Sequence, residues 1–352
     1  MKLRTLYRTA KNYTKFIITK KPHPISVSIN VTNQCPKHCI YCDAKNAVPA
    51  YMPIERLLNL LEEMKEAGVA RVSYNGGDPL MHPDIELILR HSKNLGFFTT
   101  VSVRETLIRK KLEALKHADV VFVSFDGKKE HHDKQKGKDS YDDLILAFEA
   151  LKNNNIKFQT TTVLTNINKG DIAFIANMAK KYNFQAHFQP LQFPPFKKIE
   201  HKDLMDPKKN PLVPLMISKK DHQDIGRELL TFKRAGFPIA TSEEIIKTLF
   251  LDWPDPTLTF LTYQLNKKMK CFAGILYTGI FENGDVFPCA YYNPSYYKNC
   301  PNVFKEGFRN AVKKRTNDGS CQTCLIPCYM ELNAMFSLNW KTILNWLPKV
   351  FK

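Results

Sequence analysis

Apolar and polar positions along this chain follow two alternating periods. A period of two is typical of strands, and a period near 3.6 is typical of amphipathic helices. Residues 25–30 (ISVSIN) alternate as a strand does. Residues 53–67 carry apolar side chains on one helical face, with Pro53 in the first turn and Gly68 closing the helix. Further strands are predicted over 71–75, 97–103, 120–125, 156–164 and 186–190, and further helices over 84–95, 105–117, 140–154 and 168–181.

Six such strand–helix units predict an α/β fold with a parallel sheet and right-handed crossovers. Six units favour a partial (β/α)6 TIM-like barrel over the closed eight-stranded form. Functional groups are then expected at the carboxyl ends of the strands. Ser140 and Asp143 predict a capping box at the start of the helix over 140–154. Residues 193–265 contain many prolines and predict an irregular connector, with helices starting near Ser218 and Ser242.

The two ends of the chain are basic and amphipathic. Residues 1–24 contain no Asp or Glu, and one apolar stripe at helical spacing is formed by Leu3, Leu6, Tyr7, Ala10, Tyr13 and Ile17. Residues 335–352 combine tryptophans with lysines. Both patterns fit a helix lying on anionic lipid, and both equally fit a helix packed on the protein's own body.

Composition narrows the class of protein. The chain has 352 residues, 43% of them hydrophobic, a net charge of +18 and nine cysteines. It has no apolar run long enough to span a membrane and no signal-peptide pattern, so we expect a cytoplasmic protein with reduced cysteines, able to lie at the inner face of the membrane. The charge reflects a lysine-rich composition in part, and otherwise favours an anionic membrane or nucleic acid as partner. No RNA-binding module with arginines and aromatic residues is found, which makes nucleic acid the weaker choice.

The most informative motif is TNQCPKHCIYCD, residues 32–43, where Cys35, Cys39 and Cys42 stand in a CxxxCxxC spacing. Thiolates suit iron–sulfur clusters or zinc. Three ligands on a four-iron cluster leave one iron open for another molecule. The alternatives are a zinc knuckle that recruits His38 and three ordinary reduced cysteines.

This motif, with Tyr41 before its last cysteine and a strand before its first, resembles the radical S-adenosylmethionine (radical SAM) superfamily. The resemblance implies a 4Fe-4S cluster whose open iron chelates S-adenosylmethionine and whose electron yields a 5′-deoxyadenosyl radical. Gly76-Gly77-Asp78-Pro79 ends the second predicted strand and resembles the family's GGEP motif, which holds the methionyl group. Glycines there let a ligand approach the backbone. Tyr41 is implied near the adenine.

A second stretch carries the resemblance further along the chain. Ser124-Phe125-Asp126-Gly127 ends the fourth predicted strand, and His131-His132 and Lys136 follow. Lys136 stands where the family has an Arg, and it keeps the charge without the bidentate fork. Ser124, Asp126 and Lys136 are therefore implied as further cofactor contacts. His131 and His132 are expected to form a solvated loop pair.

A second group of cysteines lies near the carboxyl end. Residues 271–289 predict a hairpin around Asn283-Gly284 that brings Cys271 close to Cys289. Cys321, Cys324 and Cys328 follow as CxxCxxxC. This layout resembles the SPASM and twitch extensions of radical SAM enzymes. It implies one auxiliary 4Fe-4S cluster on Cys271, Cys289, Cys321 and Cys324, with Cys328 as the alternative fourth ligand. A structural zinc on the same thiolates is the other possibility.

The sequence thus predicts a basic segment (1–24), a radical SAM core (25–192), a connector (193–265), a small SPASM/twitch-like domain (266–334) and an amphipathic helix (335–352). The resemblance implies an oxidoreductase that abstracts hydrogen from a peptide or protein and takes electrons from a partner such as flavodoxin or ferredoxin. No catalytic residue is assigned beyond the cluster. The alternatives are a membrane-surface radical SAM enzyme acting on a lipid or isoprenoid, and a non-catalytic zinc or Fe–S module that binds nucleic acid.

Overall fold

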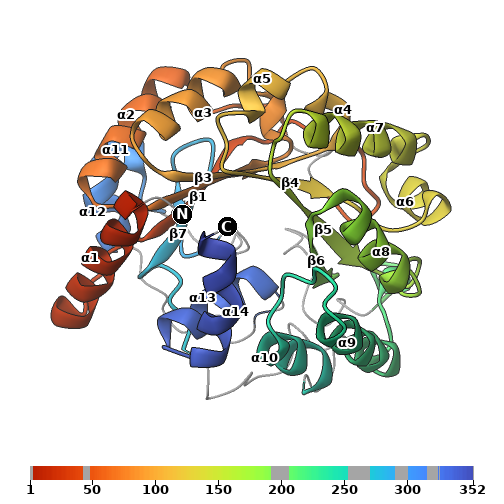
Figure 1. Ribbon diagram of the computed structural model, residues 1–352. Coiled ribbons are helices and arrows are strands. Elements are labelled where there is room, and N and C mark those ends of the chain that lie inside the picture. The colour runs from red at the N-terminus through yellow and green to blue at the C-terminus, as the bar shows by residue number, and fades with distance from the viewer. Residues whose placement is uncertain are drawn as a thin grey trace.

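The computed structural model of the chain describes residues 3–42, 48–191, 206–252, 270–289, 300–314, 324 and 326–351, with side chains as far as residue 346. Its centre is a curved sheet that helices cover on the outside (Figure 1). The strands are β1 (Ser26–Thr32), β2 (Arg71–Gly76), β3 (Phe98–Val103), β4 (Val120–Ser124), β5 (Phe158–Leu164), β6 (Gln185–Pro190), β7 (Tyr277–Ile280) and β8 (Val286–Phe287).

The strands form one sheet of eight in the order β6-β5-β4-β3-β2-β1-β7-β8. Neighbouring strands from β6 to β7 are parallel, and β8 is antiparallel to β7. The predicted α/β fold with a mostly parallel sheet is confirmed, and its arrangement is consistent with a partial barrel. The predicted hairpin over 271–289 continues this sheet beside β1, where Ser26 pairs with Tyr277. The separate cysteine-rich domain over 266–334 stays a prediction.

Helices follow most strands, as the periodicity predicts. They are α1 (Leu3–Thr19), α2 (Ile54–Glu66), α3 (Ile85–Asn94), α4 (Glu105–Ile108), α5 (Leu112–Leu115), α6 (Lys129–Lys136), α7 (Ser140–Asn153), α8 (Ile172–Tyr182), α9 (Lys219–Arg234), α10 (Glu243–Ile246), α11 (Val303–Glu306), α12 (Phe308–Lys314), α13 (Pro327–Phe336) and α14 (Trp340–Phe351). Ser218 and Ser242 are the N-caps of α9 and α10, as their positions predict.

Three local predictions were wrong. The helix expected over 105–117 is two short helices, α4 and α5. The histidines at 131 and 132 lie in helix α6 and not in a loop. The capping box is absent, because Asp139 occupies the N-cap of α7 and the Ser140 hydroxyl accepts a hydrogen bond from Lys37 instead. In the last two cases tertiary contacts decide what the local pattern leaves open.

Helix α13 connects the two sides of the open sheet. Its Glu331 accepts a hydrogen bond of 2.6 Å from the backbone N–H of Ser242, just before α10. Its Asn333 accepts one of 2.9 Å from the N–H of Phe272, just before β7. Figure 1 shows α13 and α14 in the opening between α10 and α1. The carboxyl-terminal segment therefore helps to complete the fold. Within the described ranges, no helix is both long and apolar enough to cross a lipid bilayer.

Candidate functional site

The cysteine loop leaves the carboxyl end of β1 and is fixed by backbone hydrogen bonds to two other segments. The N–H groups of Gly77 and Asp78 donate to the carbonyls of Thr32 and Gln34, at 2.9 and 2.7 Å. On the far side, Ile40 N–H donates to the carbonyl of Gln135 in α6, at 3.0 Å. Cys35, Cys39 and Cys42 are thus held between the turn after β2 and helix α6, at the carboxyl edge of the sheet where the sequence predicts the site.

Gly76 and Gly77 allow this close approach of two loops. A Cβ added at Gly76, whose φ is +129°, would lie 1.9 Å from the Thr32 carbonyl oxygen. A Cβ added at Gly77 would lie 2.1 Å from the carbonyl oxygen of Gln34. Real side chains cannot occupy these positions. The two glycines were expected to leave room for a ligand beside the backbone, whereas the chain's own backbone fills that space.

Asp78 is buried beneath the same turn. Its carboxylate accepts the N–H of Leu80 at 3.0 Å, as the N-cap of the 3-10 helix η2 (Pro79–Met81), and the N–H of Arg104 at 3.2 Å. Burial raises the pKa of this carboxyl to about 6, against the opposing charge of Arg104. Both oxygens therefore have partners within the chain. Contact between Asp78 and a cofactor stays a prediction.

Arg104, directly after β3, is the functional candidate that the sequence argument missed. Its guanidinium donates to the Ser124 hydroxyl at 2.6 Å, and its buried Nε has no hydrogen-bond partner among the described residues. Burial lowers the pKa of Arg104, but the negative charges of Cys39, Cys35 and Asp78 outweigh it and hold the pKa above its ordinary value. The sequence did contain a signal for Arg104, namely a charged residue directly after a buried strand, at the carboxyl edge of the sheet.

Arg104 also acts on the cysteines in return. Burial raises the pKa of the Cys35 thiol, while the charge of Arg104 opposes that rise. A buried cation beside thiols favours their thiolate form, which is the form that binds metal. Ser124, predicted as a cofactor contact, is occupied as the acceptor for this arginine.

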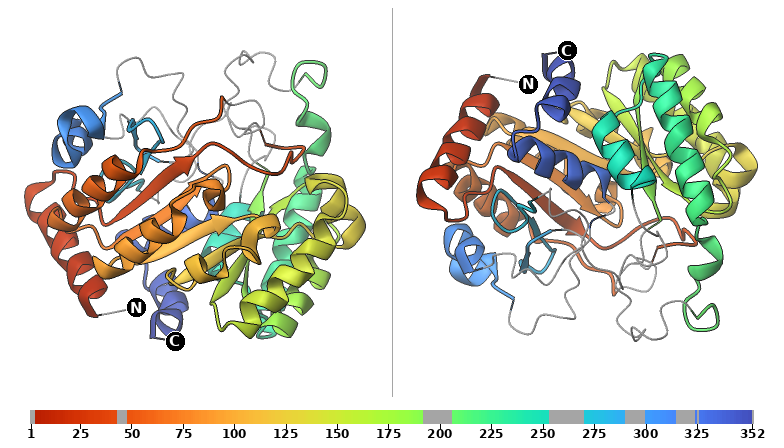
Figure 2. Two further views of the ribbon diagram at one scale, coloured as in Figure 1. Left: turned by 90° about the horizontal axis from the view of Figure 1, so that it is seen from above. Right: turned by 90° about the horizontal axis from the view of Figure 1, so that it is seen from below.

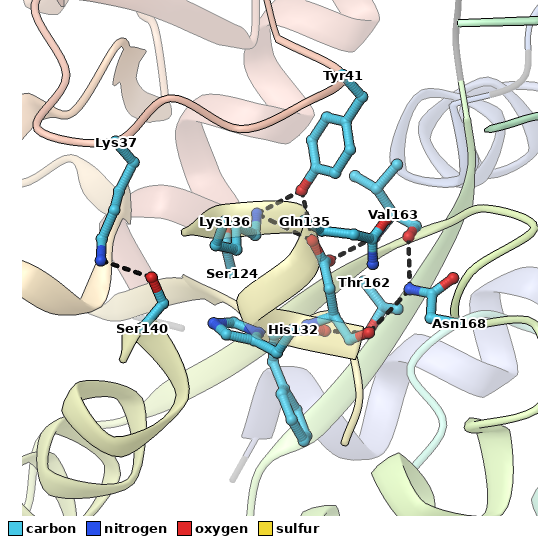
Figure 3. A network of polar contacts seen from close by, with 12 residues as sticks. Lys37, Tyr41, Ser124, His132, Gln135, Lys136, Ser140, Thr162, Val163 and Asn168 are labelled. Carbon is cyan, nitrogen blue, oxygen red and sulfur yellow. Dashed lines mark hydrogen bonds and ion pairs between the residues drawn. The ribbon is translucent and has the colours of Figure 1, made fainter. Parts of the chain in front are cut away.

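Tyr41, Asp126 and Lys136 form a polar cluster in which Asp126 and Lys136 are buried and Tyr41 is half-buried. Figure 3 shows Tyr41 and Lys136 side by side. The Tyr41 hydroxyl donates to Asp126 Oδ2 at 2.5 Å, and Lys136 Nζ lies 3.1 Å from the same oxygen and donates to the Tyr41 hydroxyl. The N–H of Val163 donates to Asp126 Oδ1 at 3.0 Å. Burial, reinforced by the charge of Asp126, raises the pKa of Tyr41 well above its ordinary value.

The charges of this cluster are therefore compensated internally. Asp126 and Lys136 neutralise each other, with 0% and 2% of their side chains exposed. The cluster ties the cysteine loop to β4, β5 and α6, which makes it a positioning element. A direct contact of Tyr41, Asp126 or Lys136 with a cofactor stays a prediction.

A second buried pair anchors the loop near its start. Lys37 Nζ lies 2.9 Å from Glu105 Oε1 and donates to the Ser140 hydroxyl at 2.7 Å. Glu105 begins α4 and Ser140 begins α7. The loop is thus attached through Lys37 before Cys39 and through the Tyr41 hydroxyl after it, and neither attachment was predicted from the sequence.

The two histidines of α6 differ in role. His132 is fully buried, and its Nδ1 accepts the N–H of Asp126 at 3.1 Å. Burial lowers the pKa of His132 to about 4, so its imidazole is neutral near pH 7. His131 is partly exposed, and its Nδ1 lies 2.7 Å from Asp171 Oδ2. His132 thus supports the backbone at Asp126, which corrects its expected place in a solvated loop.

Three of the carboxyl-terminal cysteines gather around Tyr277 of β7. Cys271 Sγ lies 3.5 Å from the Tyr277 hydroxyl. Burial raises the pKa of that hydroxyl well above its ordinary value, and the charges of Cys271, Cys324 and Cys289 raise it further. Cys321 lies outside the described residues. Cys328 is exposed in the first turn of α13.

No group of three or more His, Cys, Asp or Glu side chains in the described ranges has the arrangement of a single-ion metal site. This finding does not bear on a cubic cluster, because its cysteines bind separate irons and their sulfurs need not converge on one point. Both predicted ligand sets therefore stay predictions.

Comparison with known proteins relates this site to one superfamily. Residues 29–179 match the family model described as the radical SAM superfamily. A "PqqA peptide cyclase" of Xanthomonas oryzae pv. oryzae (strain MAFF 311018) is 31% identical over 87 residues, which are 24% of this chain and 23% of that protein. A "GTP 3′,8-cyclase" of Limosilactobacillus fermentum (strain NBRC 3956 / LMG 18251) is 32% identical over 110 residues, 28% of this chain and 33% of that protein. The curated relatives are thus matched over a minor part of their length.

Solved structures match over far more of the chain. Streptococcus suis SuiB bound to S-adenosylmethionine has a TM-score of 0.66 at 16% identity, covering 89% of this chain and 70% of that chain. Native anSMEcpe with bound AdoMet has a TM-score of 0.62 at 15% identity, covering 92% of this chain and 99% of that chain. At such identities the likeness concerns the fold alone.

Proposed function

Residues 29–179 of this chain are a radical SAM domain, and from this premise we propose that the protein is a radical SAM enzyme that modifies a peptide or a protein. The family uses a 4Fe-4S cluster and S-adenosylmethionine, and we assign the cluster to Cys35, Cys39 and Cys42. When bound, the two groups supply the 5′-deoxyadenosyl radical that removes a hydrogen atom from substrate. The chain's own residues bind and orient them.

One observation carries this proposal: the cysteine loop and the Gly76–Asp78 turn are joined by backbone hydrogen bonds at the carboxyl ends of β1 and β2. Ligands of parallel α/β sheets bind at that edge. The residues present also fit the groups. Three thiols suit an iron–sulfur cluster, and the buried Nε of Arg104 lacks a partner among the described residues beside two of them.

We assign Arg104 as the cation that binds the anionic part of the cofactor. Lys136, which stands at the family's arginine position, is neutralised by Asp126 at 3.1 Å. Arg104 keeps a donor to offer. The Ser124 hydroxyl accepts from its guanidinium and the Asp78 carboxylate accepts from its backbone N–H, which hold it in place. A buried guanidinium suits a carboxylate better than a paired lysine does.

An auxiliary 4Fe-4S cluster on Cys271, Cys289, Cys324 and Cys321 is the second part of the proposal. Its support is the arrangement of the first three around the Tyr277 hydroxyl. The protein chain there links β7 to α13 through Asn333, which accepts from Phe272 N–H and from the Tyr277 hydroxyl. The segment around Phe272 and Tyr277 would thus be held beside helix α13 by the fold itself.

The proposed peptide substrate is supported by the sequence relatives and the solved structures that this chain resembles. Relatives named PqqA peptide cyclase match its sequence, and the SuiB fold it resembles has been solved with the precursor peptide SuiA. A GTP 3′,8-cyclase also matches, so the substrate class needs its own test.

The first test counts iron and acid-labile sulfide after anaerobic reconstitution. We expect about eight irons per chain, falling to about four in a Cys35/Cys39/Cys42→Ala variant and in a Cys271/Cys289→Ala variant. With dithionite and S-adenosylmethionine, only the intact protein and the second variant should form 5′-deoxyadenosine. No iron in any of these proteins would refute the proposal. About four irons falling to none in the first variant would remove the auxiliary cluster alone.

The substrate class can be tested by following a deuterium atom. Hydrogen abstraction transfers an atom of substrate to 5′-deoxyadenosine, so a fully deuterated peptide fraction of cell extract should yield labelled product. A deuterated lipid fraction and a deuterated nucleotide fraction, matched in total deuterium, should not. Label from either of these and none from peptides would contradict the peptide assignment while leaving the radical chemistry intact.

The proposed contact of Arg104 with S-adenosylmethionine can be tested through the KM for this cofactor. Arg104→Gln should raise the KM for S-adenosylmethionine by about 10-fold or more, the typical loss for a charged hydrogen bond. Arg104→Lys should recover part of this loss, because it restores the charge without the fork. Iron content equal to that of the intact protein is the control. An unchanged KM in both variants would show that Arg104 does not contact the cofactor.

A further inference from the structure

Helix α1 packs on the body with an unexpected face. Its buried residues are Thr5, Asn12 and Phe16. Asn12 donates to the carbonyls of Pro24 and Ala67, at 3.0 and 3.2 Å. Arg8 donates to the carbonyl of Leu95 at 3.0 Å. Phe16 packs edge-on against Phe272, with ring centroids 5.8 Å apart. Hydrogen bonds and one buried aromatic ring therefore hold the helix in place.

The apolar stripe of α1 remains in the open. The exposed fractions are 86% for Leu3, 66% for Tyr7 and 75% for Ile18, and Ile17 and Ala10 are also exposed. On a helix these residues lie on the side away from Asn12 and Thr5. The sequence left open whether this stripe contacts lipid or the protein's own core. The exposure of these residues shows that most of the stripe does not pack on the core.

A second exposed apolar group belongs to the other end of the chain. Leu338, Trp340 and Leu344 are each more than half exposed. Tyr13 of α1 joins the two groups, because its hydroxyl donates to the Phe336 carbonyl at 2.8 Å and its ring stacks on the Phe336 ring at 6.1 Å. Both views of Figure 2 place the amino-terminal end of α1 beside the carboxyl-terminal end of α14.

The two terminal segments themselves carry charges of one sign, because residues 1–24 and 335–352 contain no Asp or Glu. Among the described residues outside the packed face, the basic ones are Arg4, Lys11, Lys15, Lys20, Lys21 and Lys341, and Lys341 lies 3.9 Å from Glu244 of α10. Two copies of such a surface would repel each other, which disfavours a dimer through this face. Anionic headgroups would be attracted by each basic residue near the membrane surface.

We propose that the exposed apolar residues of α1 and α14, with the basic residues beside them, form a surface that docks on an anionic lipid membrane. Basic residues flanking Trp, Leu and Tyr are the composition of helices that lie in a membrane interface. This surface does not depend on the radical chemistry proposed above. It goes beyond that function by naming where the enzyme works.

The position of α1 also decides what this docking does. Arg8 and Asn12 bind the segments that enter β1, β2 and β3, namely Pro24, Ala67 and Leu95. The cysteine loop leaves the opposite end of β1, about 20 Å away for a strand of this length. The membrane would thus lie at the end of the sheet away from the candidate site. The surface is a tether, and it does not deliver lipid to the cysteines.

The test is sedimentation of the reconstituted protein with vesicles of phosphatidylcholine alone and of phosphatidylcholine and phosphatidylglycerol in equal amounts. We expect binding to the anionic vesicles only. The double variant Tyr7→Glu/Trp340→Glu should bind at least about 10-fold more weakly, because two large interfacial side chains are lost and charge is reversed. The matched control Leu87→Glu/Leu146→Glu changes exposed leucines of α3 and α7 by the same charge.

Each outcome bears on the proposal. An equal loss of vesicle binding in the control pair overturns the proposal, because the added negative charge alone would then explain the loss. No binding of the intact protein to anionic vesicles also overturns it. A dimer in sedimentation velocity that the Tyr7/Trp340 variant dissolves also overturns it in favour of a second copy. If the glutamate variant loses its thermal unfolding transition, Tyr7→Gln/Trp340→Gln takes its place. As an independent readout, brominated lipid should quench less tryptophan fluorescence in Trp340→Phe than in the intact chain.

Discussion

His132 offers a prediction whose size follows from the structure. Its imidazole is buried in α6 between Phe125 and Tyr141, with ring centroids 6.3 and 6.2 Å away. Nδ1 accepts a backbone N–H, so Nε2 carries the proton, and Nε2 has no hydrogen-bond partner among the described residues. The native state therefore has no favourable place for a second proton on this ring.

The free energy of unfolding should consequently fall as the pH is lowered. An unfolded histidine takes up its proton near pH 6.5, whereas burial lowers the pKa of native His132 to about 4. Between these values the unfolded state binds more protons, so the stability present above pH 6.5 is lost progressively down to about pH 4. The full loss is about 3 kcal/mol, and the part between pH 6.5 and 5 is about 2 kcal/mol.

The perturbation is His132→Gln, which keeps an oxygen acceptor for the N–H of Asp126 but cannot titrate. We expect the difference in unfolding free energy between pH 7 and pH 5 to be smaller in this variant by about 2 kcal/mol. Urea unfolding of metal-free protein, followed by circular dichroism, measures it without pH-dependent metal release. His131→Gln is the control, because it makes the same substitution at the neighbouring, partly exposed histidine of α6, whose Nδ1 lies 2.7 Å from Asp171 Oδ2. Equal slopes in the intact protein and His132→Gln would refute the reasoning.

Two further predictions concern how the cysteine loop is held. Lys136→Met should lower the unfolding free energy by about 3–5 kcal/mol, since it leaves the buried Asp126 carboxylate unpaired, and adding Asp126→Asn should recover about half of this or more. If the effects of Lys136→Met and Asp126→Asn on the unfolding free energy simply add in the double variant, the proposed ion pair is contradicted. Gly77→Ala should lower the unfolding free energy by about 1–3 kcal/mol and reduce iron incorporation, because its Cβ would meet the Gln34 carbonyl. Gly170→Ala, where a Cβ meets nothing within 4 Å, is the control, and an equal effect there would count against the proposed fit of the two loops.

The alternation of strands and helices was readable from the sequence because it depends on neighbours a few residues apart. The strands β1 to β6 and the helices α2, α3, α7 and α8 lie where periodicity predicts them. The CxxxCxxC spacing similarly indicated the superfamily, because three cysteines within one loop are close together whatever the rest of the fold is. The N-caps Ser218 and Ser242 are local in the same sense.

The tertiary structure alone decided which side chains meet. Asp126 and Lys136 are ten residues apart in sequence, but their union with Tyr41 spans 85 and 95 residues. Arg104 gains its importance only because β3 places it beside Cys35 and Cys39. Such pairings depend on how strands are ordered in the sheet, and no local pattern records that order.

The packing of the two ends of the chain likewise depended on the tertiary structure. The sequence determined that residues 1–24 and 335–352 are basic, amphipathic and helical in pattern. Only packing decided that α1 docks through Thr5, Asn12 and Phe16 and leaves Leu3 and Tyr7 in solvent. That face meets the carbonyls of Pro24, Ala67 and Leu95 and the ring of Phe272, and these partners are brought together only by the folded sheet.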